Sequence, residues 1–164
     1  SRHAPRMSGS SADASSPSQH ERFVAALLDG IIATGLTALF GGAPLLGGLV
    51  GGLYLVARDG FEVGPLRFRS PGKYVMGLDL VRLDGGPVSL ETSVQRNWML
   101  GLSSVAGAFI VVPIVGGALA SFLSLAGLGF ILFEIYNVFA DPVGRRWGDR
   151  LGNTKVVAAG DGLV

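Results

Sequence analysis

The chain has 164 residues, of which 49% are hydrophobic, 15% are charged and 26 are glycine. This composition is too apolar for an ordinary soluble domain and indicates an integral membrane protein. The net charge of +1 gives no reason to expect nucleic acid, and the absence of cysteine excludes disulfides, zinc–thiolate sites and thiol nucleophiles.

The first segment, residues 1–21, is small, polar and proline-containing, so we expect a disordered N-terminal tail. An apolar helix follows at residues 23–40, within RFVAALLDGIIATGLTALF. After the leading Arg22, the only charged residue of this stretch is Asp29. An Asp within a membrane helix costs about 2.5–3.5 kcal/mol on insertion scales, so it usually faces a partner, a cavity or a functional site. Arg22 lies about 10.5 Å away along the helix axis, so we expect water or a second helix to complete the site.

The remaining apolar stretches predict three further helices. A break at FGGAP separates the first helix from a second at residues 44–57. Residues 97–140 would form a helix of roughly 66 Å, about twice the hydrocarbon thickness of a bilayer, and must fold back at VVPIVGG into helices at 98–112 and 118–140. The predicted fold is an all-α integral membrane protein with four transmembrane helices arranged as two hairpins.

The basic residues predict the orientation. All 13 Lys and Arg residues fall in the tail through Arg22, in residues 58–96 or in residues 145–155, and the two hairpin tips contain none. Because Lys and Arg collect on the cytoplasmic side of short loops, we expect a multi-pass protein of the cell membrane with both termini cytoplasmic.

Small residues recur at four-residue spacing in two of the predicted helices. In the second helix they are two pairs, Gly47 with Gly51 and Gly48 with Gly52. In the fourth helix they are the series Gly116, Ala120 and Ser124. Such rows let helices approach closely in lipid. We interpret them as packing surfaces inside the bundle, with a homodimer face as the alternative.

The middle segment is predicted to contain short cytoplasmic β and amphipathic elements. LDLVRL reads as a strand, DGG as a turn and PVSL as a short returning strand. Ser89 is a candidate N-cap with Glu91 in the first turn, so an amphipathic helix should lead through Arg96 into the third span.

The C-terminal segment resembles the middle one. RSPGKYVMGLDLVRLDGG aligns with RRWGDRLGNTKVVAAGDG, so that Gly72 meets Gly148, Lys73 meets Asp149 and Val81 meets Val157. This indicates either a parallel repeat of hairpin plus strand or a coincidence. If the repeat is real, LDLVRL and TKVVAA should lie close together, with Asp149 bonded to a basic residue or to amides of the SPGK turn.

Arg22, Asp29 and Asp149 together resemble the residues for which the RDD family is named. SPGKYVMGLDLVRLDGG, which contains Gly72 and Lys73, and DRLGNT also resemble family motifs, although Asn153 stands where the family more often has a small residue. The resemblance covers the membrane domain at residues 22–157 and leaves a C-terminal tail at 158–164. It implies a small polytopic membrane protein, for which transport of an unidentified ligand has been suggested.

The candidate ligand- or ion-binding residues are Arg22, Asp29, Glu134 and Asn137. Glu134 lies at about the depth of Asp29 in the predicted bundle, so the two carboxylates would share a proton or hold a cation. The first hypothesis is therefore transport of a small solute or ion, and the alternative is a membrane scaffold or accessory subunit that binds a protein partner. We expect no enzyme activity, cofactor or metal and no nucleic acid; the expected partners are the lipid bilayer and either further copies of this chain or another membrane protein.

Overall fold

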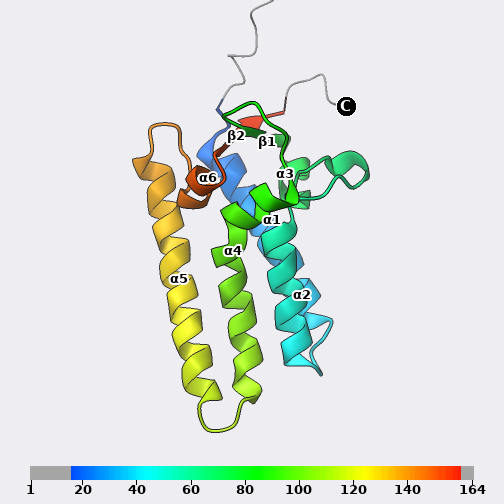
Figure 1. The fold of residues 1–164 in the computed structure, drawn as a ribbon, viewed down its shortest axis with the longest axis vertical. Helices are drawn as coiled ribbons and strands as arrows, with labels where there is room; N and C mark the ends of the chain where they lie inside the picture. Colours follow the sequence, from blue (N-terminus) through cyan, green and yellow to red (C-terminus); the bar gives the residue numbers. More distant parts are fainter. Residues whose placement is uncertain (1–15, 160–164) are drawn as a thin grey trace, which may run out of the picture.

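A computed structural model describes residues 16–159 (Figure 1). These residues are mostly helical and form two long helical hairpins, with short elements covering one end of the bundle. The long helices are α1 (Gln19–Ala38), α2 (Pro44–Ala57), α4 (Leu90–Ala106) and α5 (Gly116–Ala140). The short elements are α3 (Pro71–Val75), α6 (Trp147–Leu151), two 3-10 helices (Gly64–Leu66 and Gly107–Val111) and the strands β1 (Leu78–Arg82) and β2 (Thr154–Ala158).

The helix boundaries differ from the predicted ones mainly at the N-terminus of α1 and at the C-terminus of α4, which ends at Ala106. Ser18 and Glu21 form a capping box, in which each side chain accepts the other residue's backbone amide, so α1 begins within the predicted tail. Residues 1–15 and 160–164 of the two predicted tails lie outside the described residues. Ser89 caps α4 as predicted, by accepting the amide of Thr92.

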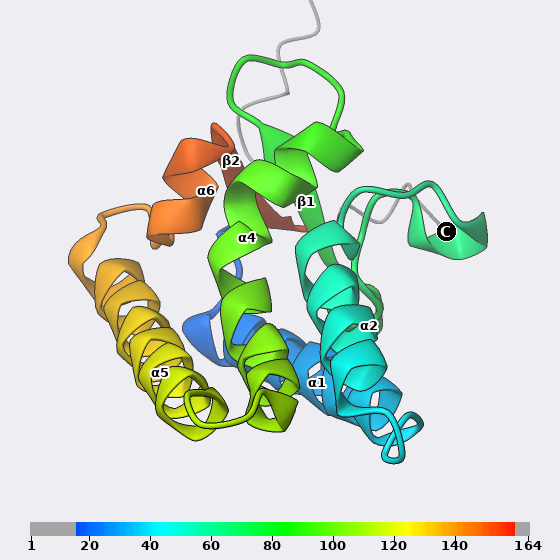
Figure 2. The same ribbon diagram turned by 60° about the horizontal axis from the view of Figure 1, so that its bottom comes forward.

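The long helices form an open row rather than a closed ring. α1 packs on α2, α2 on α4 and α4 on α5. Figure 2 shows α5, α4 and α2 side by side, seen from the hairpin tips, with α1 running behind α4 and α2. Within the described chain, α1 and α5 make almost no contact with each other. The two ends of the row are therefore left without a packing partner on one side.

Glycines of α2 allow its close approach to both neighbours. A Cβ at Gly51 would overlap the Thr37 side chain of α1, and one at Gly52 would lie 3.2 Å from the carbonyl oxygen of Gly101 in α4. The interpretation of this row as internal packing is confirmed. In α5 it holds in part, because Ala120 is buried and Ser124 is exposed.

The two strands pair with each other, which corrects one prediction. β1 runs antiparallel to β2, with Leu80 opposite Val156, whereas residues 87–89 form no strand. The prediction of a returning strand after the DGG turn was wrong, because this stretch leads directly to Ser89, which caps α4, and β1 pairs with β2 from the end of the chain instead. The expectation that LDLVRL and TKVVAA lie close together is confirmed.

The repeat is visible in the order of the short elements. A shift of 76 residues carries α3 onto α6 and β1 onto β2, end to end. It also carries Gly77 onto Asn153, and both residues have a positive φ, of 61° and 50°. Each half is thus a long helical hairpin followed by a short helix, a left-handed residue and a strand.

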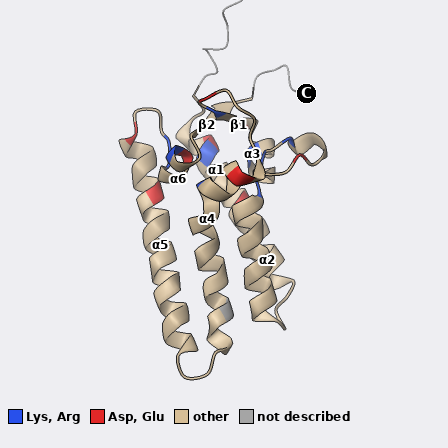
Figure 3. Ribbon diagram, in the orientation of Figure 1, with Lys and Arg blue, Asp and Glu red and all other residues tan. Residues whose placement is uncertain are grey.

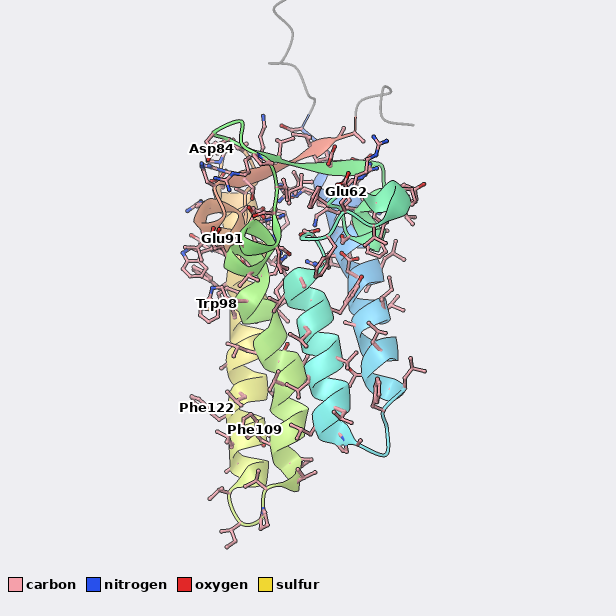
Figure 4. The ribbon with its side chains drawn as sticks, turned by 45° about the vertical axis from the view of Figure 1, so that its right-hand side comes forward. Glu62, Asp84, Glu91, Trp98, Phe109 and Phe122 are labelled. Atoms are coloured by element: carbon pink, nitrogen blue, oxygen red, sulfur yellow. The ribbon has the colours of Figure 1, made fainter. Side chains whose placement is uncertain are left out.

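Charged residues gather at one end of the bundle, which we call the charged end and which carries α3, α6, β1 and β2 (Figure 3). The opposite end consists of the two hairpin tips and is apolar. Figure 4 shows Glu62, Asp84 and Glu91 at the charged end, Trp98 just below them, and Phe109 and Phe122 toward the tips.

Candidate ligand-binding site at the charged end

Asp29, the single acid of the first apolar stretch, is 1% exposed and is bonded to three donors. Its Oδ1 accepts the hydroxyl of Tyr54 at 3.1 Å and the amide of Gly72 at 2.9 Å, and its Oδ2 accepts Arg58 Nη1 at 3.0 Å. Tyr54 and Arg58 belong to the C-terminal end of α2. A second helix therefore completes the site, as predicted, and Arg22 is not its partner.

Asp59, directly after α2, is fully buried and was not among the predicted residues. Its carboxylate accepts from Lys73 Nζ, from Arg96 Nη1 at 3.2 Å and from Asn97 Nδ2 at 3.3 Å. Burial alone would raise the pKa of the Asp59 carboxyl, but Lys73 and Arg96 hold it well below its usual value. Burial lowers the pKa of Lys73 to about 8, against the opposing effect of Asp59.

Asp149, in α6, is the most heavily paired acid of the charged end. It accepts from Arg22 Nη2 at 3.1 Å, from Arg96 Nη2 at 2.5 Å and from Arg146 Nη2 at 3.1 Å. Although burial raises the pKa of this carboxyl, the three arginines hold it far below the usual range. The prediction that Asp149 bonds a basic residue is confirmed, but Lys73, its counterpart in the repeat, pairs with Asp59 instead.

Arg96 joins these acids into one network. Its side chain is fully buried and donates to both Asp59 and Asp149. The network therefore ties the end of α2, the middle of α4 and the short helix α6 together. A buried charge without its partners would be costly, so the network can persist only as a unit.

Glu134, in α5, accepts the backbone amides of Trp147 at 2.7 Å and Gly148 at 3.0 Å. It therefore binds the N-terminus of α6, where unpaired amides favour an acceptor. The structure forms no bond between Glu134 and Asp29. Asn137 is also separate from Asp29, because its amide donates to the carbonyl of Phe133 within α5.

Gly72 and Gly148, the counterparts in the repeat, lie in matching surroundings. A Cβ at Gly72 would overlap the carbonyl oxygen of Ala25 in α1, and a Cβ at Gly148 would overlap that of Arg96 in α4. Each amide donates to a carboxylate of a long helix. A close glycine contact and an acid thus hold each short helix, both from α1 in the case of α3, and from α4 and α5 respectively in the case of α6.

A cavity of about 410 Å³ lies between the unpaired ends of the helix row. Its sides come from α1 and α5, including Phe23, Leu27, Ile131 and Ile135, and α2, α4 and the sheet complete it. Arg22, Asp29 and Glu134 line this cavity, whereas Asn137 does not. Three of the four candidate residues thus converge on one cavity, together with Arg58, Lys73, Arg96 and Arg146.

The main residues that the sequence analysis missed are Arg58, Asp59 and Arg96. All three flank apolar stretches; Arg58 and Arg96 entered only the arguments on topology and on the amphipathic helix, and Asp59 was not considered. The repeat carried a further signal, because the shift of 76 residues that aligns the short helices also carries Arg58 onto Glu134. Both residues lie near the charged end of the second helix of a hairpin, and both help to hold a short helix. Arg58 bonds Asp29, which accepts the Gly72 amide of α3, whereas Glu134 itself accepts the Gly148 amide of α6.

Comparison with known proteins gives one match. The family model of the RDD family matches residues 16–153, which confirms the family resemblance noted in the sequence. The chain has no significant match among curated proteins or among solved structures.

Proposed function

The chain belongs to the RDD family, a family of membrane proteins, and we propose that it is a four-span carrier of a small solute that binds between α1 and α5. Three features support this proposal, namely the apolar surface, the distribution of charge and the cavity. The cavity, on which Arg22, Asp29 and Glu134 converge, is the observation that carries it.

The apolar surface supports a membrane location. By length and composition, α5 is the one helix in the described part of the chain that could cross a bilayer by itself. Only 17% of its most apolar 18-residue stretch is buried, so it is not a core helix of a soluble protein. Large apolar side chains are also exposed on α1, α2 and α4, and hydrocarbon is the environment that such a surface requires.

The charge distribution supports four spans with both termini in the cytoplasm. α1 has 20 residues, which corresponds to about 30 Å and matches the hydrocarbon thickness. The described basic residues lie at the charged end, and neither hairpin tip carries one. In this orientation the charged end, with the sheet, faces the cytoplasm.

The bonding of the carboxylates favours the cavity over an acid pair as the solute site. Asp29 already accepts three donors, one of them the Arg58 guanidinium, and Glu134 accepts two backbone amides of α6, so both acids are engaged by protein donors rather than by each other's proton. The described residues also contain no cluster of three or more His, Asp or Glu side chains suited to a metal ion. In this proposal the two acids shape the cavity and the solute occupies its apolar interior.

Cysteine accessibility tests the proposal without knowledge of the solute. The chain lacks cysteine, and a Cβ at Gly30, which lines the cavity, meets nothing within 4 Å. In a carrier, Gly30→Cys should react with a membrane-impermeant maleimide added to either face of sealed vesicles. Gly42→Cys at a hairpin tip and Gly86→Cys after β1 are one-sided controls. Reaction of Gly42→Cys from the cytoplasmic face would refute the four-span orientation.

The alternative is a scaffold that binds a protein partner. The buried charge network around Arg96 favours this function, since it fixes the charged end and is typical of a structural element. In a scaffold, Gly30→Cys should react from one face at most. That outcome, with both controls labelled as expected, would replace the carrier proposal by the scaffold.

A further inference from the structure

The cavity occupies the position of a missing helix contact. In the repeat, α1 and α2 of the first half correspond to α4 and α5 of the second. The extensive packing of α2 on α4 would have its counterpart in packing of α5 on α1, which the structure lacks. A gap between two apolar helices in a bilayer does not stay empty, so something apolar must fill it.

The charged end of the cavity carries an excess of positive charge. Five cationic side chains line it, from Arg22, Arg58, Lys73, Arg96 and Arg146, against the two acids Asp29 and Glu134. Asp59 and Asp149 neutralise part of this charge from behind, but Glu134 bonds backbone amides rather than a cation. Four carboxylates therefore face five cations, and an anion entering the cavity would balance them.

Arg58 has a donor that no protein group satisfies. Its side chain is 5% exposed, its Nη1 is bonded to Asp29, and its Nε is buried without a hydrogen-bond partner. A buried guanidinium N–H left unpaired is costly. Arg58 lines the cavity, and its Nη2 has no hydrogen-bond partner among the described residues and is not among the fully buried atoms, so an acceptor oxygen of a ligand in the cavity can bond the guanidinium there.

We propose that the solute is an anionic phospholipid, whose acyl chain fills the gap between α1 and α5 and whose phosphate binds Arg58, with Arg22 and Arg146 beside it. A lipid satisfies the apolar walls and the cationic end together, which a free phosphate or a neutral lipid does not. The charged end is also the end at which a headgroup of the cytoplasmic leaflet would lie in the proposed orientation. This inference rests on the proposed function and names its substrate class.

The test measures lipid retention by the full-length protein in detergent. The protein is incubated with phosphatidylglycerol, with phosphatidylcholine or with inorganic phosphate, and bound phosphorus is measured after gel filtration. We expect about one phosphatidylglycerol per chain and at least tenfold less phosphatidylcholine or free phosphate. Equal retention of the two lipids would overturn the proposal, because it would indicate a general lipid coat.

Matched variants locate the site. Gly30→Trp fills the cavity and should abolish retention, whereas Gly35→Trp places the same side chain on an exposed face of α1 and should not. Arg58→Lys keeps the charge but removes the planar guanidinium and its Nη2 donor, and should weaken retention about tenfold or more. Wild-type retention in Gly30→Trp would show that the lipid binds elsewhere and would refute the proposal.

The two proposals can fail separately. If Gly30→Cys reacts from both faces and phosphatidylglycerol is not retained, the carrier stands and the lipid as its substrate is excluded. If phosphatidylglycerol is retained and lost in Gly30→Trp, while Gly30→Cys reacts from one face only, the lipid site stands and the carrier is excluded.

Discussion

Leu80 and Val156 face each other at the centre of the two-stranded sheet, and the same two residues are equivalent in the internal repeat. An antiparallel pair whose central residues are also repeat equivalents has a pseudo-two-fold axis between them. The sheet is therefore the element where the two halves meet as near copies. The helices obey the same relation only in part, because α2 packs on α4 and their counterparts α5 and α1 do not pack.

The register of the sheet predicts which cysteine pairs form a disulfide. Val81 lies opposite Lys155, so Val81→Cys with Lys155→Cys should crosslink under mild oxidation. Val157, which meets Val81 in the repeat alignment, lies opposite Asp79 and is a diagonal neighbour of Val81, at about 7–8 Å. Val81→Cys with Val157→Cys is thus the matched control, and preferential crosslinking of that pair would contradict the observed register.

The close contacts at the two repeat glycines predict a steric effect of alanine. Gly72→Ala and Gly148→Ala should each destabilise the protein by about 1–3 kcal/mol, since the added methyl group overlaps backbone of α1 or α4. Thermal unfolding in detergent measures the effect. Gly129→Ala in α5 is the control, because a Cβ there meets nothing within 4 Å. Three equal melting temperatures would mean that the short helices are not held tightly against the bundle.

The helices were predictable because their signals are local. Apolar length, the Ser89 cap and the breaks near Pro44 and Pro113 depend on neighbouring residues, and the structure agrees with them. The strand that pairs with β1 was not predictable from local signals. A strand of five residues can pair with any suitable edge, and the actual partner of β1 lies at the end of the chain. The alignment of the two repeats correctly predicted that LDLVRL lies beside TKVVAA, whereas proximity in sequence wrongly indicated PVSL as the partner strand.

The charge pairs of the site were predictable only by residue type. The sequence indicated that water or a second helix would complete the site of Asp29, and that Asp149 would bond a basic residue or amides of the SPGK turn; the structure has the second helix and the basic residue. It could not indicate that Arg58 serves the first and Arg96 the second, since both sit among many basic residues. Pairing across 29 or 53 positions is set by how the helices pack.

The buried Asp29–Arg58 pair predicts a non-additive effect of mutation. Asp29→Asn leaves Arg58 charged, 5% exposed and without its counter-charge, so it should destabilise the protein by about 3–5 kcal/mol. Adding Arg58→Met removes the stranded charge and should restore much of that loss. Thermal unfolding of the two single variants and the double variant forms the cycle.

The same three variants also show whether Asp29 has a structural role or carries a proton. If Asp29 carried a proton, the Asp29→Asn variant would fold normally and lose only its transport activity. A wild-type melting temperature for Asp29→Asn, or a double variant less stable than either single one, would contradict the structural role.

The lowered pKa values of Asp59 and Asp149 predict loss of stability in acid. Both carboxyls are less easily protonated in the folded protein than in the unfolded chain, where the pKa is about 3.9. Their contribution is therefore complete above about pH 4 and is lost as the pH falls toward the folded values. The melting temperature in detergent should be nearly constant from pH 7 to 5 and fall steeply below pH 4.

Variants identify the acids responsible for this profile. Asp149→Asn should lower the melting temperature at pH 7, since three arginines lose their shared counter-charge, and should flatten the decline below pH 4. Asp84→Asn is the control, because its partner Arg82 is also partly exposed and surface ion pairs contribute little. If Asp149→Asn kept the wild-type slope below pH 4, protonation of Asp149 could not be a cause of the acid unfolding, and Asp59 and Asp141, whose pKa values are also lowered, would have to account for it.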